Sequence, residues 1–106
     1  MKIKVYADTI CGWCYIGHSR LLKAIGTFKE IAFDFEHAPF QLNPDMPKDG
    51  MSRADYLKYK FGSKELAQQM YDGMNIEATK EDLKFNLDGI QITPNTKFSH
   101  ILTKLA

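Results

Sequence analysis

The stretch that most constrains this chain is Asp8-Thr-Ile-Cys-Gly-Trp-Cys-Tyr15, because it holds both cysteines, three positions apart. It follows an alternating apolar pattern and precedes a helical one, so Cys11 is expected at the N-terminal end of a helix. Free backbone N–H groups and the helix dipole favour negative charge at such a position. The sequence therefore predicts that the pKa of the Cys11 thiol is lowered, and that Cys14 can close a disulfide with it.

The composition argues against several classes of function. Fourteen basic and 13 acidic residues give a net charge of +1, without a block of like charge, so neither nucleic acid nor a membrane surface is an expected partner. No apolar run approaches the roughly 18 residues that span a bilayer, and the N-terminal segment lacks the apolar centre of a signal peptide. We expect a cytoplasmic protein, in which a purely structural disulfide is uncommon.

The first part of the chain has the pattern strand, helix, strand. Alternation predicts a strand over residues 2–7 and a second, edge-like strand over 31–37, and apolar residues at helical spacing predict a helix over 12–29. Short connections join these elements into a βαβ unit, so the two strands should be parallel. A loop with three prolines over 38–50 then leaves the sheet.

The second part of the chain has helical signals. Ser52 and Ser63 are expected to cap two helices separated by Gly62. An apolar stripe of the second helix is expected to lie in the core: Leu66, Ala67, Met70, Tyr71 and Met74. Asn95 or Thr96 is expected to cap a last helix. Its apolar residues are Phe98, Ile101, Leu102 and Leu105.

That last pattern reaches the end of the chain without a stop signal. Two parallel strands alone do not make a stable sheet, and a parallel sheet needs helices on both faces. We therefore interpret the sequence as the first half of a fold. The other half is expected either as a missing C-terminal part or from a second copy in a homodimer.

Several segments in the same order resemble one family. They are Asp8 through Gly17 with the Cys-Gly-Trp-Cys pair, Pro39 through Pro47, Asp55 through Gly62, and Thr93-Pro-Asn-Thr96 leading to His100. With these segments the chain resembles the DsbA-like branch of the thioredoxin superfamily, and within it the FrnE-type dithiol-disulfide isomerases. Relatives of that group include 2-hydroxychromene-2-carboxylate isomerases and kappa-class glutathione transferases.

The resemblance implies an α/β fold, with a thioredoxin-like βαβ half over residues 1–40 and part of an α-helical insertion over 41–106. It implies a thiol–disulfide oxidoreductase or isomerase, in which an exposed Cys11 attacks a substrate disulfide and a buried Cys14 resolves the product. No metal or organic cofactor is required, and glutathione is a candidate co-substrate. The expected substrate is a protein with a disulfide or a small thiol. The family's cis-proline loop, which faces the cysteine pair, would lie in the missing half.

Two other functions remain open. One is a glutathione-dependent isomerase or transferase of the same fold, although those relatives typically carry serine at the position of Cys11. The other is a non-catalytic, truncated association module. The two thiols can also be inert, or be half of a zinc site with His18, His37 or His100, although no second ligand pair at zinc spacing is present.

Five residues are candidates for substrate binding. Trp13 is expected at the apolar rim of the site, and its neighbour Tyr15 is expected to pack. Gly12 stands where the family usually has proline, which loosens the turn and affects the redox potential. Phe40, Asn43 and Asn95 belong to segments that approach the site in the family. The two asparagines are equally well explained as a turn and a helix cap.

Two residues are candidates for proton transfer. Asp8 lies in the loop before the cysteines, and His18 lies one turn beyond Cys14 on the same helical stripe. Asp8 as a structural cap and His18 as an ordinary core histidine are the alternatives.

Overall fold

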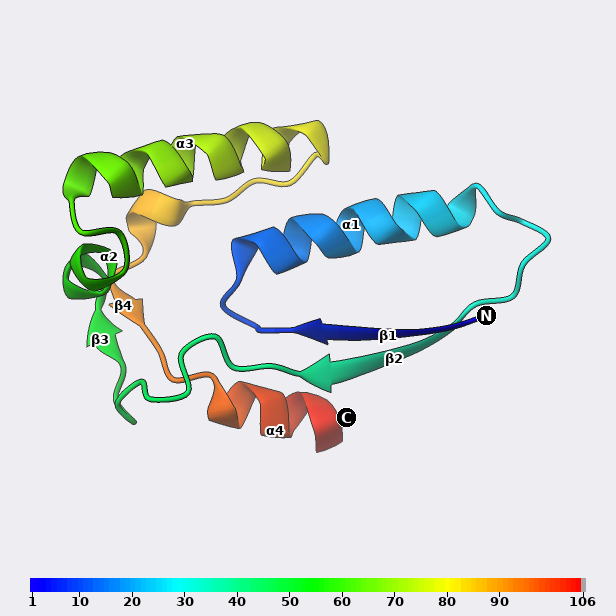
Figure 1. Cartoon of the computed structure of the whole chain (residues 1–106), viewed down its shortest axis with the longest axis horizontal. Coiled ribbons are helices and arrows are strands. Elements are labelled where there is room, and N and C mark those ends of the chain that lie inside the picture. The colour runs from blue at the N-terminus through cyan, green and yellow to red at the C-terminus, as the bar shows by residue number, and fades with distance from the viewer. Residues whose placement is uncertain (106) are drawn as a thin grey trace. The chain divides into compact units, whose positions relative to one another are not determined.

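The structure is a computed structural model that describes residues 1–105 (Figure 1). Its elements are β1 (Lys2–Ala7), α1 (Gly12–Gly26), β2 (Asp34–Pro39), β3 (Met51–Ser52), α2 (Arg53–Phe61), α3 (Lys64–Lys80), the short 3₁₀ helix η1 (Leu87–Gly89), β4 (Ile92–Thr93) and α4 (Lys97–Leu105). No helix within residues 1–105 is both long and apolar enough to cross a membrane.

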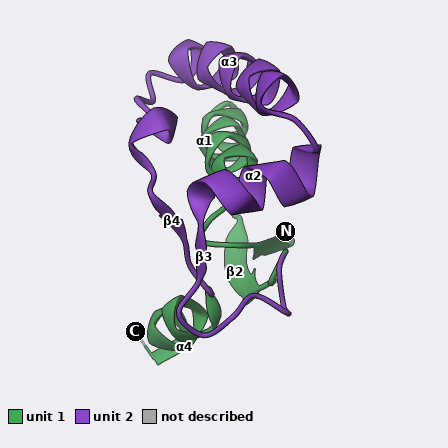
Figure 2. Cartoon of the chain, turned by 90° about the vertical axis from the view of Figure 1, so that its left-hand side faces the viewer, with its two compact units in different colours: residues 1–42, 96–106 green, residues 43–95 purple. Residues whose placement is uncertain are grey.

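The chain forms two compact units (Figure 2). Unit 1 consists of residues 1–42 and the segment that begins at Thr96, and unit 2 consists of residues 43–95. The last helix, α4, therefore belongs to the same unit as the first strand. The division into domains at residue 40 stays a prediction, since compact units are not by themselves domains.

Unit 1 is built on two parallel strands. Lys2 of β1 lies opposite Asp34 of β2, and Ala7 lies opposite Pro39 at the other end. Helix α1 lies along one face of this pair and α4 lies on the other side (Figure 1). The predicted βαβ unit is confirmed. Because the strands are parallel, their carboxyl ends meet at one edge of the sheet, and α1 begins there.

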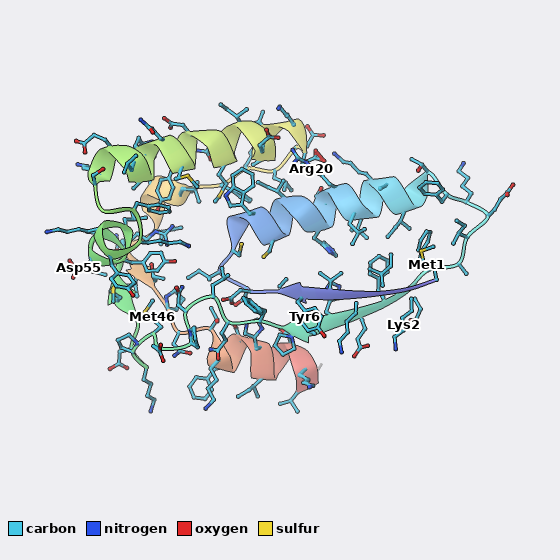
Figure 3. All side chains as sticks on the ribbon, in the orientation of Figure 1. Met1, Lys2, Tyr6, Arg20, Met46 and Asp55 are labelled. Atoms are coloured by element: carbon cyan, nitrogen blue, oxygen red, sulfur yellow. The ribbon has the colours of Figure 1, made fainter. Side chains whose placement is uncertain are left out.

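The two faces of β1 follow the predicted alternation. Lys2, Lys4 and Tyr6 are exposed, and the labelled Lys2 and Tyr6 point away from α1 (Figure 3). The ammonium groups of Lys2 and Lys4 lie 3.6 and 3.8 Å from the carboxylate of Glu36 on β2. Such exposed ion pairs add little stability, so the less exposed face toward α1 is the one that fixes the strand.

Helix α1 is shorter than predicted. It ends at Gly26 rather than at residue 29. The N–H and the hydroxyl of Thr27 both donate to the carbonyl of Ala24, at 3.1 and 2.6 Å, which tightens the last turn and stops the helix.

Strand β2 begins later than predicted, at Asp34 rather than at residue 31. The N–H of Ile31 donates to the carbonyl of Phe28, so the chain is still turning there. Pairing starts where the N–H of Asp34 donates to the carbonyl of Met1, at 2.9 Å. The alternation of apolar residues begins before the hydrogen-bonded strand does, and the sequence-based boundary was therefore wrong by three residues.

The helix caps of unit 2 agree with the sequence. The hydroxyl of Ser52 accepts the N–H of Asp55, and the hydroxyl of Ser63 accepts the N–H of Leu66, both at 3.2 Å. Gly62, between α2 and α3, has a φ of +80°, which glycine adopts without strain. Short-range signals were sufficient to place these two helices.

A charged side chain lies among the aromatic residues of unit 2. Arg53 donates through Nε to the hydroxyl of Tyr71 at 2.6 Å and through Nη1 to the hydroxyl of Thr93 at 3.1 Å. Its guanidinium also lies 5.3 Å from the ring centre of Tyr56. The three partners are buried, so Arg53 joins α2, α3 and β4.

The predicted core stripe of α3 is only partly correct. Ala67 and Tyr71 are buried, but Leu66 and Met70 are 51% and 42% exposed. The buried line of α3 continues instead through Ala78. The helix therefore packs along a narrow line through Ala67, Tyr71 and Ala78, while Met74 of the predicted stripe is half-buried.

A short antiparallel pair, β3 with β4, was not predicted. Met51 lies opposite Thr93, and Ser52 opposite Ile92. Gly50 precedes it with a φ of +81°, and a Cβ there would lie 2.6 Å from the carbonyl oxygen of Thr93. Only glycine fits this close approach. Two residues are too few for a readable period-2 pattern.

Helix α4 is confirmed, and its apolar side chains are exposed. It begins at Lys97, directly after Thr96, whose carbonyl accepts the N–H of His100 at 3.1 Å. Of the two candidate caps, Thr96 therefore holds the position. The predicted apolar residues of this helix are between 45% and 81% exposed: Phe98, Ile101, Leu102 and Leu105.

Candidate active site

The two cysteines lie where β1 gives way to α1. Cys11 is the N-cap residue of α1, in extended conformation, and its Sγ accepts the N–H of Cys14 at 3.3 Å. The N–H of Cys11 donates to the carbonyl of Asp8 at 3.3 Å, which fixes the loop before the helix. The predicted strand-to-helix junction is confirmed, with both side chains as free thiols.

The expected contrast between an exposed Cys11 and a buried Cys14 is not found. Both thiols are partly exposed. Both belong to the start of α1 and line one open pocket of about 220 Å³. That pocket is formed by Val5, Ala7, Asp8, Thr9, Cys11, Cys14, Tyr15, His18 and His37. It brings together the dithiol and both residues that the sequence predicts for proton transfer.

The prediction of a lowered Cys11 pKa is wrong for this structure. Burial raises the pKa of the Cys11 thiol, and the nearby thiol of Cys14 raises it further. The backbone N–H groups of Cys14 and Trp13 act in the opposite direction but do not outweigh these two effects. Local helix geometry supplies the favourable N–H groups, and the surrounding pocket decides the sign.

His18 lies one helical turn beyond Cys14, on the side of α1 that faces the sheet. Its Nδ1 is buried and has no hydrogen-bond partner. The centre of the His18 ring lies 5.3 Å from the centre of the His37 ring. His37 belongs to β2, and its side chain is exposed. His37 entered the sequence analysis only as a zinc-ligand alternative. The i, i+4 spacing to Cys14 was a signal for His18, but none was present for the contact with His37.

The zinc alternative is not supported. Within residues 1–105 no group of three or more His, Cys, Asp or Glu side chains is arranged to hold a metal ion. His100, one of the three candidate histidines, is instead bonded to Asp8 through Nε2 at 3.0 Å.

Asp8 is a fully engaged carboxylate. Its side chain is only 1% exposed. One oxygen accepts the N–H of Leu42 at 2.8 Å and the other is 3.0 Å from Nε2 of His100. Burial alone raises the pKa of Asp8, but the bonds from Leu42, Thr96 and His100 together lower it below its ordinary value. Asp8 thus joins the end of β1 to the segment after β2 and to α4.

The aromatic residues around the dithiol are exposed. Trp13 is 41% exposed, as expected for the rim of a site. Tyr15 is 57% exposed and lines the dithiol pocket, so the expectation that it packs is wrong. Phe40, after β2, is 51% exposed, and Gly12 is the first residue of α1. The binding roles of Trp13, Gly12 and Phe40 stay predictions.

Two predicted binding residues lie in unit 2 and bond within it. Nδ2 of Asn43 donates to the hydroxyl of Tyr56 at 3.3 Å, and Nδ2 of Asn95 donates to the carbonyl of Met46 at 2.7 Å. Neither lines the dithiol pocket. Unit 2 has a pocket of its own of about 510 Å³, beside Arg53, which contains none of the predicted site residues.

Comparisons with known proteins agree with the architecture. The model of the DSBA-like thioredoxin domain matches residues 2–106. A search of curated proteins finds no match. Among solved structures, a probable DsbA oxidoreductase from Streptomyces coelicolor superposes with a TM-score of 0.87 at 30% sequence identity. The superposition covers 100% of this chain and 46% of that one, so the chain spans about half the length of this relative. The predicted fold class is confirmed.

The raised pKa of Cys11 predicts how its alkylation depends on pH. The rate with iodoacetamide should keep rising above the ordinary thiol pKa of about 8.5, because only the thiolate reacts. Replacing Cys14 with alanine removes the neighbouring thiol but not the burial, so the midpoint should move to lower pH. Mass spectrometry of the alkylated chain measures both rates. A wild-type rate that is already level by pH 8 would contradict this assignment.

The bonds of Asp8 predict a dependence of stability on pH. Because its folded-state pKa is lowered, ionised Asp8 stabilises the fold above its unfolded pKa of about 3.9, and this contribution is lost as the pH falls through the folded value. Asp8→Asn should be less stable than wild type by about 1–3 kcal/mol at pH 6. The difference should shrink toward pH 3 in urea unfolding. Asp49→Asn, which removes an exposed carboxylate, is the control. An Asp8→Asn difference that is equal at both pH values would refute the assignment.

Proposed function

The chain belongs to the DSBA-like thioredoxin domain family, and on that premise we propose that it acts as a thiol–disulfide oxidoreductase. The observation that carries the proposal is the Cys11–Cys14 pair, two free thiols in the first turn of a helix that share one open pocket. In a Cys-x-x-Cys pair at a helix start, the first thiolate can attack a disulfide and the second thiol can resolve the product.

The reaction follows from the positions of the two sulfur atoms. The Cys11 thiolate attacks one sulfur of a substrate disulfide, and the other substrate sulfur leaves as a thiolate. The Cys14 thiol then loses its proton and its sulfur attacks Sγ of Cys11, which closes the Cys11–Cys14 disulfide and releases the second substrate thiolate. The substrate gains two electrons, and the protein dithiol loses two.

The environment of Cys11 favours reduction or isomerisation of substrate disulfides over strong oxidation. A dithiol is a strong oxidant when its reduced form is stabilised, above all by a low thiol pKa. Burial acts against this at Cys11, where it raises the pKa. Gly12, at the position where the family usually has proline, leaves the turn less restricted. A reducing role also suits the cytoplasm, which we propose as the compartment.

Three exposed aromatic side chains support a polypeptide as substrate. Trp13 and Tyr15 flank Cys14 in the sequence, and Phe40 follows β2 in the same unit. Aromatic rings bind extended chains through large apolar area at a low cost in entropy. Within the family we propose the FrnE-type isomerase activity, without a metal or organic cofactor, and with glutathione or a thioredoxin-type protein to recycle the dithiol. Asn43 and Asn95 remain candidate contacts to the substrate.

The alternatives differ in chemistry. A glutathione-dependent isomerase or transferase of this fold uses only the residue at the position of Cys11, which is typically serine. It has no use for a second thiol at the position of Cys14. The free thiol of Cys14 beside Cys11 therefore favours disulfide exchange. A non-catalytic association module would keep the fold and the thiols but turn over no disulfide.

We propose in addition that the active species contains more polypeptide than one copy of this chain. The outer edges of β1 and β2 carry unpaired backbone groups within the described residues, and such edges recruit further strands. The apolar residues of α4 are exposed on the same unit. The additional polypeptide is a second copy of this chain or a C-terminal half that corresponds to the remainder of the longer relative.

Turnover of insulin disulfides with dithiothreitol tests the proposed reaction. The wild type should speed the reduction of insulin, and Cys11→Ser should not, because the attacking sulfur is gone. Cys14→Ser should accumulate a mixed disulfide with insulin, visible by mass spectrometry, because the resolving sulfur is gone. A chain without turnover, whose Cys11 still alkylates readily, would instead identify the non-catalytic module.

Light scattering tests the proposed association. A self-associating chain should give a mass of at least twice the 12.2 kDa of one copy, and the value should fall on dilution. Leu102→Lys and Leu105→Lys, which place charges on the exposed face of α4, should weaken association if that face takes part. A single species of 12.2 kDa that unfolds cooperatively would rule out the second copy as partner.

A further inference from the structure

The Nδ1 of His18 is a buried polar atom of unit 1 that the reaction described above does not use. It has no hydrogen-bond partner, whereas buried side-chain nitrogens in proteins are nearly always paired. An unpaired buried nitrogen costs stability, so its position calls for a reason beyond packing. Its surroundings supply one, because His18 lines the pocket that contains both thiols.

The imidazole of His18 lies one helical turn from the resolving thiol of Cys14, and both line the same pocket. Cys14 and His18 are four residues apart on α1, so their side chains lie on the same face one turn apart. Nδ1 is not directly bonded to either sulfur. The pocket of about 220 Å³ that they share has room for several water molecules, since one water takes about 30 Å³.

The second histidine, His37, connects the imidazole of His18 to solvent. The ring of His37 lies 5.3 Å from that of His18, and His37 is exposed while Nδ1 of His18 is not. The two rings come from α1 and β2, so the pair forms only when helix and sheet are packed together.

We propose that His18 is the base that takes up the proton of Cys14, through a water molecule in the pocket, when Cys14 resolves the mixed disulfide, and that His37 passes this proton to solvent. The proposal rests on the disulfide exchange proposed above and assigns the group that controls its second step. Imidazole is the side chain that gains and loses protons near neutral pH, and one intervening water is compatible with general base catalysis.

The step balances with a neutral His18 whose proton is on Nε2. The S–H bond of Cys14 breaks, its proton moves to the water, and a proton of that water moves to Nδ1 of His18. The Cys14 sulfur forms a bond to Sγ of Cys11, and the bond from Cys11 to the substrate sulfur breaks. The substrate leaves as a thiolate, and the imidazolium returns its extra proton to solvent by way of His37.

The other titratable groups that line the pocket fit this role less well. They are Asp8, Cys11, Tyr15 and His37. Both oxygens of Asp8 already accept hydrogen bonds, and those bonds keep its pKa low. Cys11 is itself the sulfur under attack in this step. The neutral hydroxyl of Tyr15 is a far weaker base than imidazole, and the ring of His37 is on the solvent side of His18.

The closure of the disulfide can be measured without a protein substrate. The reduced 106-residue chain is mixed with dithionitrobenzoate, an aromatic disulfide that releases a coloured thiolate. The first release reports the mixed disulfide at Cys11, and the second reports the attack of Cys14. Stopped-flow absorbance from pH 5.5 to 8.5 then gives the rate of the second step alone.

We expect the wild-type closure rate to stay high at pH 6.5. The disulfide of His18→Leu should close at least about tenfold more slowly at pH 6.5. A general base contributes roughly a hundredfold or more at its optimum, and a smaller effect is expected away from the optimum. The rate should then rise with pH as Cys14 ionises unaided, and added imidazole should restore part of it. His37→Asn should also slow the closure of the disulfide, but by a smaller factor than His18→Leu.

Two further variants separate proton transfer from a structural role. His18→Asn keeps a polar group near the position of Nδ1 but cannot take up a proton, so it should be as slow as His18→Leu. Asp49→Asn, which removes an exposed carboxylate of unit 2, should keep the wild-type profile. Circular dichroism checks folding, and if His18→Leu does not fold, His18→Asn decides the question.

Each outcome has one meaning. If the wild type never releases the second thiolate, the proposed disulfide exchange itself fails. If the wild type closes normally but His18→Asn keeps its rate and pH profile, the exchange stands and the role of His18 is refuted. Slow closure in both His18 variants, with recovery in imidazole buffer, supports the proposal.

Discussion

The buried carboxylate of Asp8 is the interaction on which unit 1 depends. It lies after β1 and bonds to the amide of Leu42 beyond β2 and to the ring of His100 on α4, two partners that are 34 and 92 positions away. The backbone carbonyl of the same residue accepts the N–H of Cys11. A carboxylate buried without such partners would be very costly. The same residue therefore holds three distant segments together and fixes the loop that presents the dithiol.

The dithiol shows how opposing effects set a thiol's chemistry. The start of α1 supplies backbone N–H groups that favour a thiolate at Cys11, and this is the effect that its position in the sequence suggests. Burial and the thiol of Cys14 act against it and prevail. A reduced form that gains little from an ionised Cys11 supports the proposed reduction or isomerisation of substrate disulfides over strong oxidation. A resolving step that needs help with its proton is consistent with this balance.

Features that depend on a few neighbouring residues were predictable. The caps at Ser52 and Ser63, the turn at Gly62 and the parallel pairing of the first two strands follow from local hydrogen bonds and short connections. The start of β2 was misplaced because apolar alternation begins before the backbone pairs. The core of unit 2 was predicted only in part, because a pattern of apolar residues gives no sign that Arg53 bonds to buried hydroxyl groups.

For the candidate site, the sequence by itself determined that two thiols stand one turn apart at the start of a helix, with His18 one turn further on. These relations are fixed by helix geometry and hold wherever the helix forms. Only the tertiary structure decided the direction of the Cys11 pKa, the partners of Asp8 and the contact between His18 and His37. The physical reason is that burial and contacts between distant segments arise from packing of helix against sheet, and a periodic pattern specifies which face is buried but not which side chains meet there.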